Sequence, residues 1–129
     1  MVSGTKNMKV KVASRTVCAA LALLSCAAWS HAGLVKSEPG RRAALTAAPT
    51  QIRLCFNEQV EPKFSSVSLI RADAAAIELG ALDADPKDPR CLSAKITGEM
   101  STGDFTVKYK VLSVDGHVVD YGFGFSVRP

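Results

Sequence analysis

Two residues near the C-terminus could hold a metal ion together. Asp115 and His117 flank Gly116 in the run "KVLSVDGHVVDYGFGFSV". Residues two apart in an extended segment project from the same face, so the carboxylate and the imidazole could converge on one point. Gly116 permits backbone angles that other residues resist. This pair predicts a partial metal site, and the alternative is an Asp-Gly turn that happens to precede a histidine.

The other histidine of the sequence, His31, would extend this pair if it became the N-terminus of the mature chain. An N-terminal histidine offers both its ring nitrogen and its α-amine, whose usual pKa of about 7.7–8.0 allows it to lose a proton on metal binding. With Asp115 and His117, the set has three nitrogens and one oxygen. Such a set favours one copper(II) ion before nickel(II), with tetrahedral zinc as the second choice.

The first 30 residues have the features of a secretory signal peptide. A basic stretch precedes an uncharged apolar run at 16–29, which is too short to span a bilayer comfortably and ends in small residues. A buried N-terminal helix is the alternative. We expect cleavage after Ser30, which starts a mature domain at residues 31–129. Cleavage after Ala32 would discard His31, and a lipoprotein cut before Cys26 in "LLSC" would leave it internal.

Removal of the signal changes the charge of the chain. The whole sequence has 16 Lys and Arg against 12 Asp and Glu, and four of the bases leave with the signal while no acid does. The mature chain is formally neutral, which argues against nucleic acid as a partner. It has no second apolar run long enough for a membrane span, so we expect a monomeric periplasmic protein, or a lipid-anchored one if Cys26 is modified.

Two cysteines, Cys55 and Cys91, remain after the signal is removed. Each lies in an alternating segment, "IRLCF" or "CLSAKI", in which the neighbouring apolar residues share the opposite face. An oxidising compartment favours one disulfide between them, and two unpaired thiols are the alternative.

Period-two alternation predicts an all-β domain. It is clearest at residues 105–111 and 121–127, where Tyr109, Tyr121, Phe123 and Phe125 should be core residues. Turn clusters separate the segments, and "RAALTAAPT" is expected to be a loop. About seven short strands in roughly a hundred residues predict a Greek-key, immunoglobulin-like β-sandwich. The remaining expected strands are residues 33–37, 51–57, 66–70, 77–79 and 91–96.

Two other polar clusters receive simpler interpretations. Arg41 and Arg42 are expected in a solvated loop rather than an anion site. Asp83, Asp85 and Asp88 in "DADPKDP" lack the glycine and glutamate spacing of an EF-hand loop, so we predict a turn there.

Across residues 31–127, "HAGLVKSEPG", "APTQIRLCFNEQVEPKFSSVSL" and "GDFTVKYKVLSVDGHVVDYGFGFSV" resemble the CopC family of periplasmic copper-resistance proteins. The resemblance implies a β-sandwich that holds copper(II) through His31, Asp115 and His117, and a CopD-like inner-membrane transporter as partner. Some family members also carry a Met-rich segment for copper(I). This chain has only Met100 after the signal, so we expect no copper(I) site of that kind.

The leading hypothesis is therefore an exported copper(II)-binding protein, and not an enzyme, that buffers copper or delivers it to a transporter. A non-metal interaction module, lipid-anchored if Cys26 is modified, is the alternative. A copper oxidase or oxygenase is a third reading, since such enzymes also use an N-terminal histidine. A carboxylate ligand and the lack of a further catalytic set argue against it.

Overall fold

Alternating apolar residues build the strands of a two-layer domain. The computed structural model describes Gly4 and residues 32–129, and the latter form nine β-strands and one short 3-10 helix. The elements are β1 (Leu34–Glu38), β2 (Ala44–Leu45), β3 (Gln51–Phe56), η1 (Pro62–Phe64), β4 (Ser66–Arg71), β5 (Ala76–Ile77), β6 (Asp83–Asp85), β7 (Asp88–Lys95), β8 (Gly103–Leu112) and β9 (Val118–Val127).

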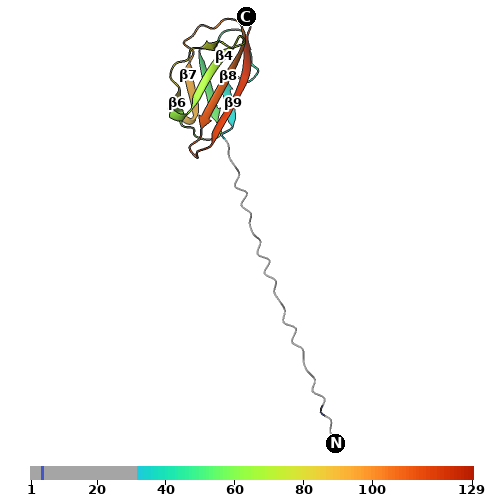
Figure 1. Cartoon of the computed structure of the whole chain (residues 1–129), viewed down its shortest axis with the longest axis vertical. Coiled ribbons are helices and arrows are strands. Elements are labelled where there is room, and N and C mark those ends of the chain that lie inside the picture. Colours follow the sequence, from blue (N-terminus) through green and yellow to red (C-terminus); the bar gives the residue numbers. More distant parts are fainter. Residues whose placement is uncertain (1–3, 5–31) are drawn as a thin grey trace.

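The strands form two sheets that face each other. One sheet has the order β1-β3-β7-β6 and the other β2-β9-β8-β4-β5, so the chain passes repeatedly from one sheet to the other. Figure 1 shows β4, β8 and β9 side by side in one layer. The long β8–β9 hairpin pairs Gly103 with Val127 at one end and Leu112 with Val118 at the other. This confirms the predicted all-β sandwich.

The core lies between the sheets and follows the predicted alternation. On β8, Phe105, Val107, Tyr109 and Val111 are buried, whereas Lys108 and Lys110 between them are exposed. Such a pattern is expected for strands with one face in the core. The opposing sheet contributes its own alternate residues to the same cluster, namely Ile52, Leu54, Phe56 and Leu92.

Two elements differ from the sequence prediction. The expected loop "RAALTAAPT" contains the two-residue strand β2, which pairs in parallel with the end of β9. The acidic stretch predicted as a turn does turn at Pro86 and Lys87, but the residues on either side form an edge hairpin of β6 and the start of β7. There Asp85 accepts a hydrogen bond from Arg53 at 2.9 Å, and Asp88 pairs with Arg90 at 3.0 Å. Both elements are too short for periodicity to reveal, and pairing with a longer strand defines them.

Tyr121 does not lie in the core, contrary to the sequence prediction. Its side chain is 69% exposed, whereas Phe125 on the same strand is 3% exposed. The difference arises because β2 pairs only with Ser126 and Val127, and so β9 lacks a pairing partner on that side near Tyr121. The alternating pattern identifies the inward face of β9 but not where the strand beside it in the sheet ends.

The predicted disulfide between Cys55 and Cys91 is confirmed. The two residues are directly opposite each other on β3 and β7, with their Cα atoms 4.0 Å apart. Both cysteines are buried. They are not members of the core cluster between the sheets, to which their sequence neighbours Leu54, Phe56 and Leu92 belong. The bond therefore ties the two central strands of one sheet across a sequence separation of 36 residues.

Candidate metal centre

The candidate ligands lie in the turn that joins β8 to β9. The Ser113 N–H donates to the His117 carbonyl at 2.9 Å, and the Gly116 N–H donates to the Ser113 carbonyl at 3.0 Å. Gly116 has a φ of +91°, a backbone conformation that favours glycine, as the sequence predicted. Asp115 and His117 thus lie in a closed turn, and not in the extended segment that the two-residue spacing suggested.

The turn brings the two candidate ligands together. His117 Nδ1 lies 3.0 Å from Asp115 Oδ1, and the His117 N–H donates to the same oxygen at 3.3 Å. The side chains of His117 and Asp115 are 38% and 40% exposed. The predicted convergence is therefore present, with both side chains partly exposed, although the His117 Nδ1 atom itself is buried.

The separation of these atoms fits two neighbouring positions around one metal ion. Imidazole nitrogens bind divalent zinc at about 2.0–2.1 Å, and two ligands at that distance and at a right angle are roughly 2.9 Å apart. The 3.0 Å between Nδ1 and Oδ1 is close to this value. The same distance is also that of the hydrogen bond between the two side chains in this structure. An imidazole and a carboxylate are donors that suit a tetragonal copper(II) ion, which has the highest affinity in the divalent series.

Ser113 supports the pair, and sequence reasoning did not identify it. Its side chain is 1% exposed and its hydroxyl donates to Asp115 Oδ1. Serine is common in turns, so nothing in the letters "SVDGH" distinguishes this hydroxyl from an exposed one. The contact with Asp115 is local, whereas the burial of Ser113 accompanies its β-bridge with Val60, which lies far from it in sequence.

The pKa of Asp115 is lowered from 3.8 to about 2, first by the hydrogen bond from Ser113 and then by that from His117. Because the pKa is lowered by folding, ionised Asp115 stabilises the fold above about pH 4, and this contribution is lost as the pH falls through about 2. We expect an NMR titration of the Asp115 carboxyl carbon to have its midpoint near pH 2. A midpoint near 4 would contradict these hydrogen bonds.

The low pKa of Asp115 leads to a prediction for the pH dependence of metal binding at this candidate site. Asp115 remains ionised between pH 4 and 7, so its carboxylate should contribute no pH dependence to metal affinity in that range. We expect copper(II) affinity to fall with decreasing pH. An Asp115→Asn variant should bind more weakly but keep the same pH profile, as measured by chelator competition at several pH values. A flattened profile in this variant would contradict the assignment.

The turn lies at the end of the sandwich where the described domain begins. The Gly33 N–H donates to Asn57 Oδ1 at 2.8 Å, and the Asn57 N–H donates back to the Gly33 carbonyl at 2.9 Å. The same loop reaches the turn, because the Val114 N–H donates to the Gln59 carbonyl at 3.2 Å and Val60 bridges to Ser113. Residues 57–61 therefore link the start of the domain to the turn.

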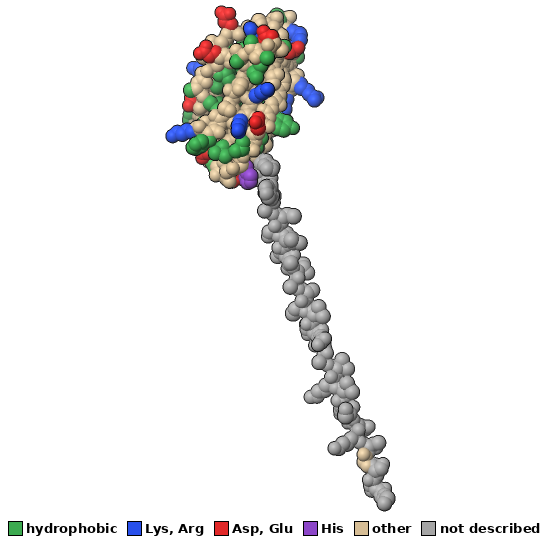
Figure 2. Space-filling model, in the orientation of Figure 1, with side chains coloured by type: hydrophobic (Ala, Val, Ile, Leu, Met, Phe, Trp, Pro, Cys, Tyr) green, Lys and Arg blue, Asp and Glu red, His purple; other side chains and the backbone are tan. Residues whose placement is uncertain are grey.

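Figure 2 shows a histidine side chain at this end of the domain. His31, the third predicted ligand residue, lies outside the described residues. Ala32, which follows it in sequence, is 1% exposed and packs in the core. Within residues 32–129, no group of three or more His, Cys, Asp or Glu side chains is placed to hold a metal ion.

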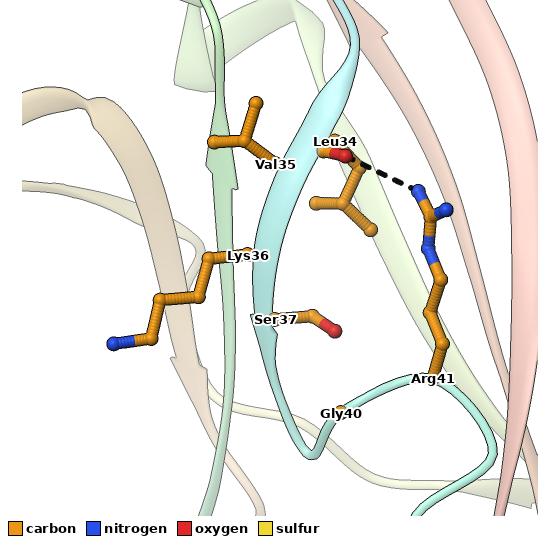
Figure 3. Close-up of a pocket in the computed structure, with 6 residues that line it drawn as sticks. All are labelled: Leu34, Val35, Lys36, Ser37, Gly40 and Arg41. Carbon is orange, nitrogen blue, oxygen red and sulfur yellow. Dashed lines mark hydrogen bonds between the residues drawn. The ribbon is translucent and has the colours of Figure 1, made fainter.

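A shallow recess beside β1 is a separate surface feature. It has a volume of about 250 Å³ and is lined by residues 34–37 with Gly40 and Arg41. Figure 3 shows the Arg41 guanidinium directed at the Leu34 carbonyl, to which it donates at 3.3 Å, while Lys36 points away from it. The two positive charges do not converge, so the recess lacks the geometry of an anion site.

The fold and the turn define a small β-sandwich protein with a carboxylate–imidazole pair at one end, suited to a divalent cation. The CopC domain model matches residues 34–128, and the chain belongs to the CopC family. No helix among the described residues is long and apolar enough to cross a membrane.

Relatives and a solved structure support this assignment. Protein YobA of Escherichia coli K12 is 30% identical over 99% of this chain and its own full length. Copper resistance protein C of Xanthomonas campestris pv. juglandis is 30% identical over 91% of this chain and 95% of its own. The crystal structure of CopC from Methylosinus trichosporium OB3b matches with a TM-score of 0.71 and 30% identity, covering 77% of this chain and 95% of that chain.

Proposed function

We propose that this chain is an exported protein that binds one copper(II) ion in the periplasm. The observation that carries the proposal is the 3.0 Å approach of His117 Nδ1 to Asp115 Oδ1 in a partly exposed turn. Membership of the CopC family and the similarity to a copper resistance protein support copper as the ion. The protein would capture copper and would not catalyse a reaction.

The proposed ligands are the α-amine and ring of His31, the Asp115 carboxylate and the His117 imidazole. This set requires that residues 1–30 are removed as a signal peptide and that residues 31–129 form the mature domain. The burial of Ala32 supports a cut before it, because cleavage after Ala32 would remove a residue of the core. The hydrogen bonds between Gly33 and Asn57 would hold this N-terminus beside the loop that contacts the turn.

Each donor has a distinct part in capture. Asp115 supplies a negative charge that offsets part of the charge of copper(II), and it is ionised before the ion arrives. His117 and His31 supply neutral nitrogens, which suit copper(II) better than they suit calcium or magnesium. Carboxylate and nitrogen ligands together therefore favour copper(II) over the hard cations.

We further propose that the protein buffers copper or delivers it, as a monomer, to a CopD-like transporter in the inner membrane. About 40% exposure of both ligand side chains would allow the ligands of an acceptor to approach the bound ion. Copper accumulation in cells that lack this protein separates the two roles. Lower accumulation would support delivery, and unchanged accumulation with greater copper sensitivity would support buffering.

The intact mass of the protein exported by its native host, with and without copper(II), tests the proposed site. A chain that begins at His31 and gains one copper ion would support all four donors. A chain that begins at Gly33, or at a lipidated Cys26, would rule out the amine of His31 as a ligand. A chain that begins at His31 but gains no copper would overturn the proposed function.

A further inference from the structure

Ser113 is the buried polar residue at the end of the sandwich that carries the candidate metal centre. Within the described part of the chain, it is the one polar side chain in the buried set, at 1% exposure. A buried hydroxyl is unfavourable unless it is hydrogen-bonded, so its partners indicate what it does.

The main chain of Ser113 closes the turn without help from its side chain. Its N–H donates to the His117 carbonyl at 2.9 Å, and its carbonyl accepts from the Gly116 N–H at 3.0 Å. The residue also forms a β-bridge with Val60, which fastens the turn to the 57–61 loop. An alanine at position 113 would keep all of these backbone interactions.

The hydroxyl, in contrast, acts on a candidate ligand. It has one hydrogen to donate, and its shorter contact is with Asp115 Oδ1, while the His117 carbonyl lies 3.3 Å away. Asp115 is 40% exposed, and without this donor only the contacts with His117, at 3.0 and 3.3 Å, would oppose rotation of the carboxylate toward water. With this donor, the same oxygen is held 3.0 Å from His117 Nδ1.

We propose that Ser113 is a positioning residue for metal capture, whose hydroxyl holds the Asp115 carboxylate in the orientation that faces His117. This inference rests on the proposed function, since copper(II) is the ion that Asp115 and His117 are proposed to bind. Groups that orient metal ligands commonly change metal affinity by about 10–100-fold. Without the hydroxyl, the ion would itself have to order the carboxylate, and affinity would fall by a factor in this range.

The chain offers a matched control in Ser65. Its hydroxyl donates to the Glu61 carbonyl at 2.6 Å and accepts from the Leu112 N–H at 3.2 Å. It thus bridges the same end of the hairpin with hydrogen bonds to backbone groups rather than to Asp115 or His117. Ser113→Ala and Ser65→Ala each remove one partly or fully buried hydroxyl, and thermal unfolding should show both variants folded.

The first measurement uses copper-free protein and NMR couplings that report the χ1 angle of Asp115. We expect one χ1 rotamer in the parent and in Ser65→Ala, and averaged rotamers in Ser113→Ala. The second measurement is copper(II) affinity by chelator competition. We expect a 10–100-fold loss in Ser113→Ala, a change within twofold in Ser65→Ala, and partial recovery in Ser113→Thr, which keeps the hydroxyl.

An Asp115 rotamer that is unchanged in Ser113→Ala, or affinities that are equal in the two alanine variants, would overturn the positioning role. A parent protein that fails to bind copper(II) would instead overturn the proposed function. In that case the χ1 measurement on copper-free protein still decides whether Ser113 orients Asp115, so the two failures remain distinguishable.

Discussion

A His117→Ala variant should lose more than about 100-fold in copper(II) affinity and remain folded. Removal of a group that only orients a ligand already costs about 10–100-fold, and His117 is proposed as a direct ligand. Its side chain is 38% exposed and lies in a turn, outside the core cluster, so the sandwich does not depend on it. Chelator competition gives the affinity, and circular dichroism with thermal unfolding reports the fold.

Asp120→Ala is the matched control for this prediction. Asp120 is an exposed acidic residue on β9, paired with Lys110 in the hairpin register and three residues beyond His117. Its removal changes the charge of the hairpin without touching the turn, so copper(II) affinity should stay within a few fold of the parent. A His117→Ala variant that binds copper as tightly as Asp120→Ala would refute the assignment of His117 as a ligand.

Removal of the disulfide, in a Cys55→Ala/Cys91→Ala variant, should reduce the free energy of unfolding by about 3–4 kcal/mol. This value follows from the chain-entropy model for a loop of 36 residues, since the bond restricts the unfolded chain. For a domain of this size, the melting temperature should fall by on the order of 20 °C. Urea unfolding of oxidised parent and variant, followed by circular dichroism, measures the difference.

Chemical reduction of the parent provides an independent route to the same state. The reduced parent and the double variant should unfold at similar urea concentrations, both well below that of the oxidised parent. Ser93→Ala is a suitable control, because Ser93 is a partly buried neighbour on β7 that pairs with Arg53 and takes no part in the bond. A double variant as stable as Ser93→Ala would show that the disulfide contributes little.

The candidate site illustrates how far local sequence reasoning extends. The types and spacing of Asp115, Gly116 and His117 correctly predicted a carboxylate and an imidazole that converge, and a glycine with an unusual backbone angle. The reason given for the convergence was wrong, because the segment is a hydrogen-bonded turn and not an extended strand. The spacing of two residues shows that they are close in sequence. The backbone conformation between them is set by hydrogen bonds, which the spacing does not reveal.

Among the strands, too, some were predicted from the sequence and others were missed. Long alternating segments such as β8 and β9 were predicted within a few residues, because one face of each meets the core along most of its length. The two-residue β2 and the three-residue β6 were missed, since they carry too few residues for any period. Tyr121 was misplaced for a related reason: β9 is the edge of its sheet at this residue, since the short β2 pairs only with Ser126 and Val127.

The sequence by itself determined the all-β class, the inward faces of the long strands and the family resemblance, and it predicted one disulfide and a metal-binding pair in the β8–β9 turn. These properties follow from residue type and short-range periodicity, which act locally along the chain. Only the tertiary structure decided that Cys55 lies opposite Cys91, that the 57–61 loop joins the start of the domain to the turn, and that Ser113 is buried where it bridges to Val60. These depend on contacts between segments far apart in sequence, whose register is set by the packing of the whole sandwich.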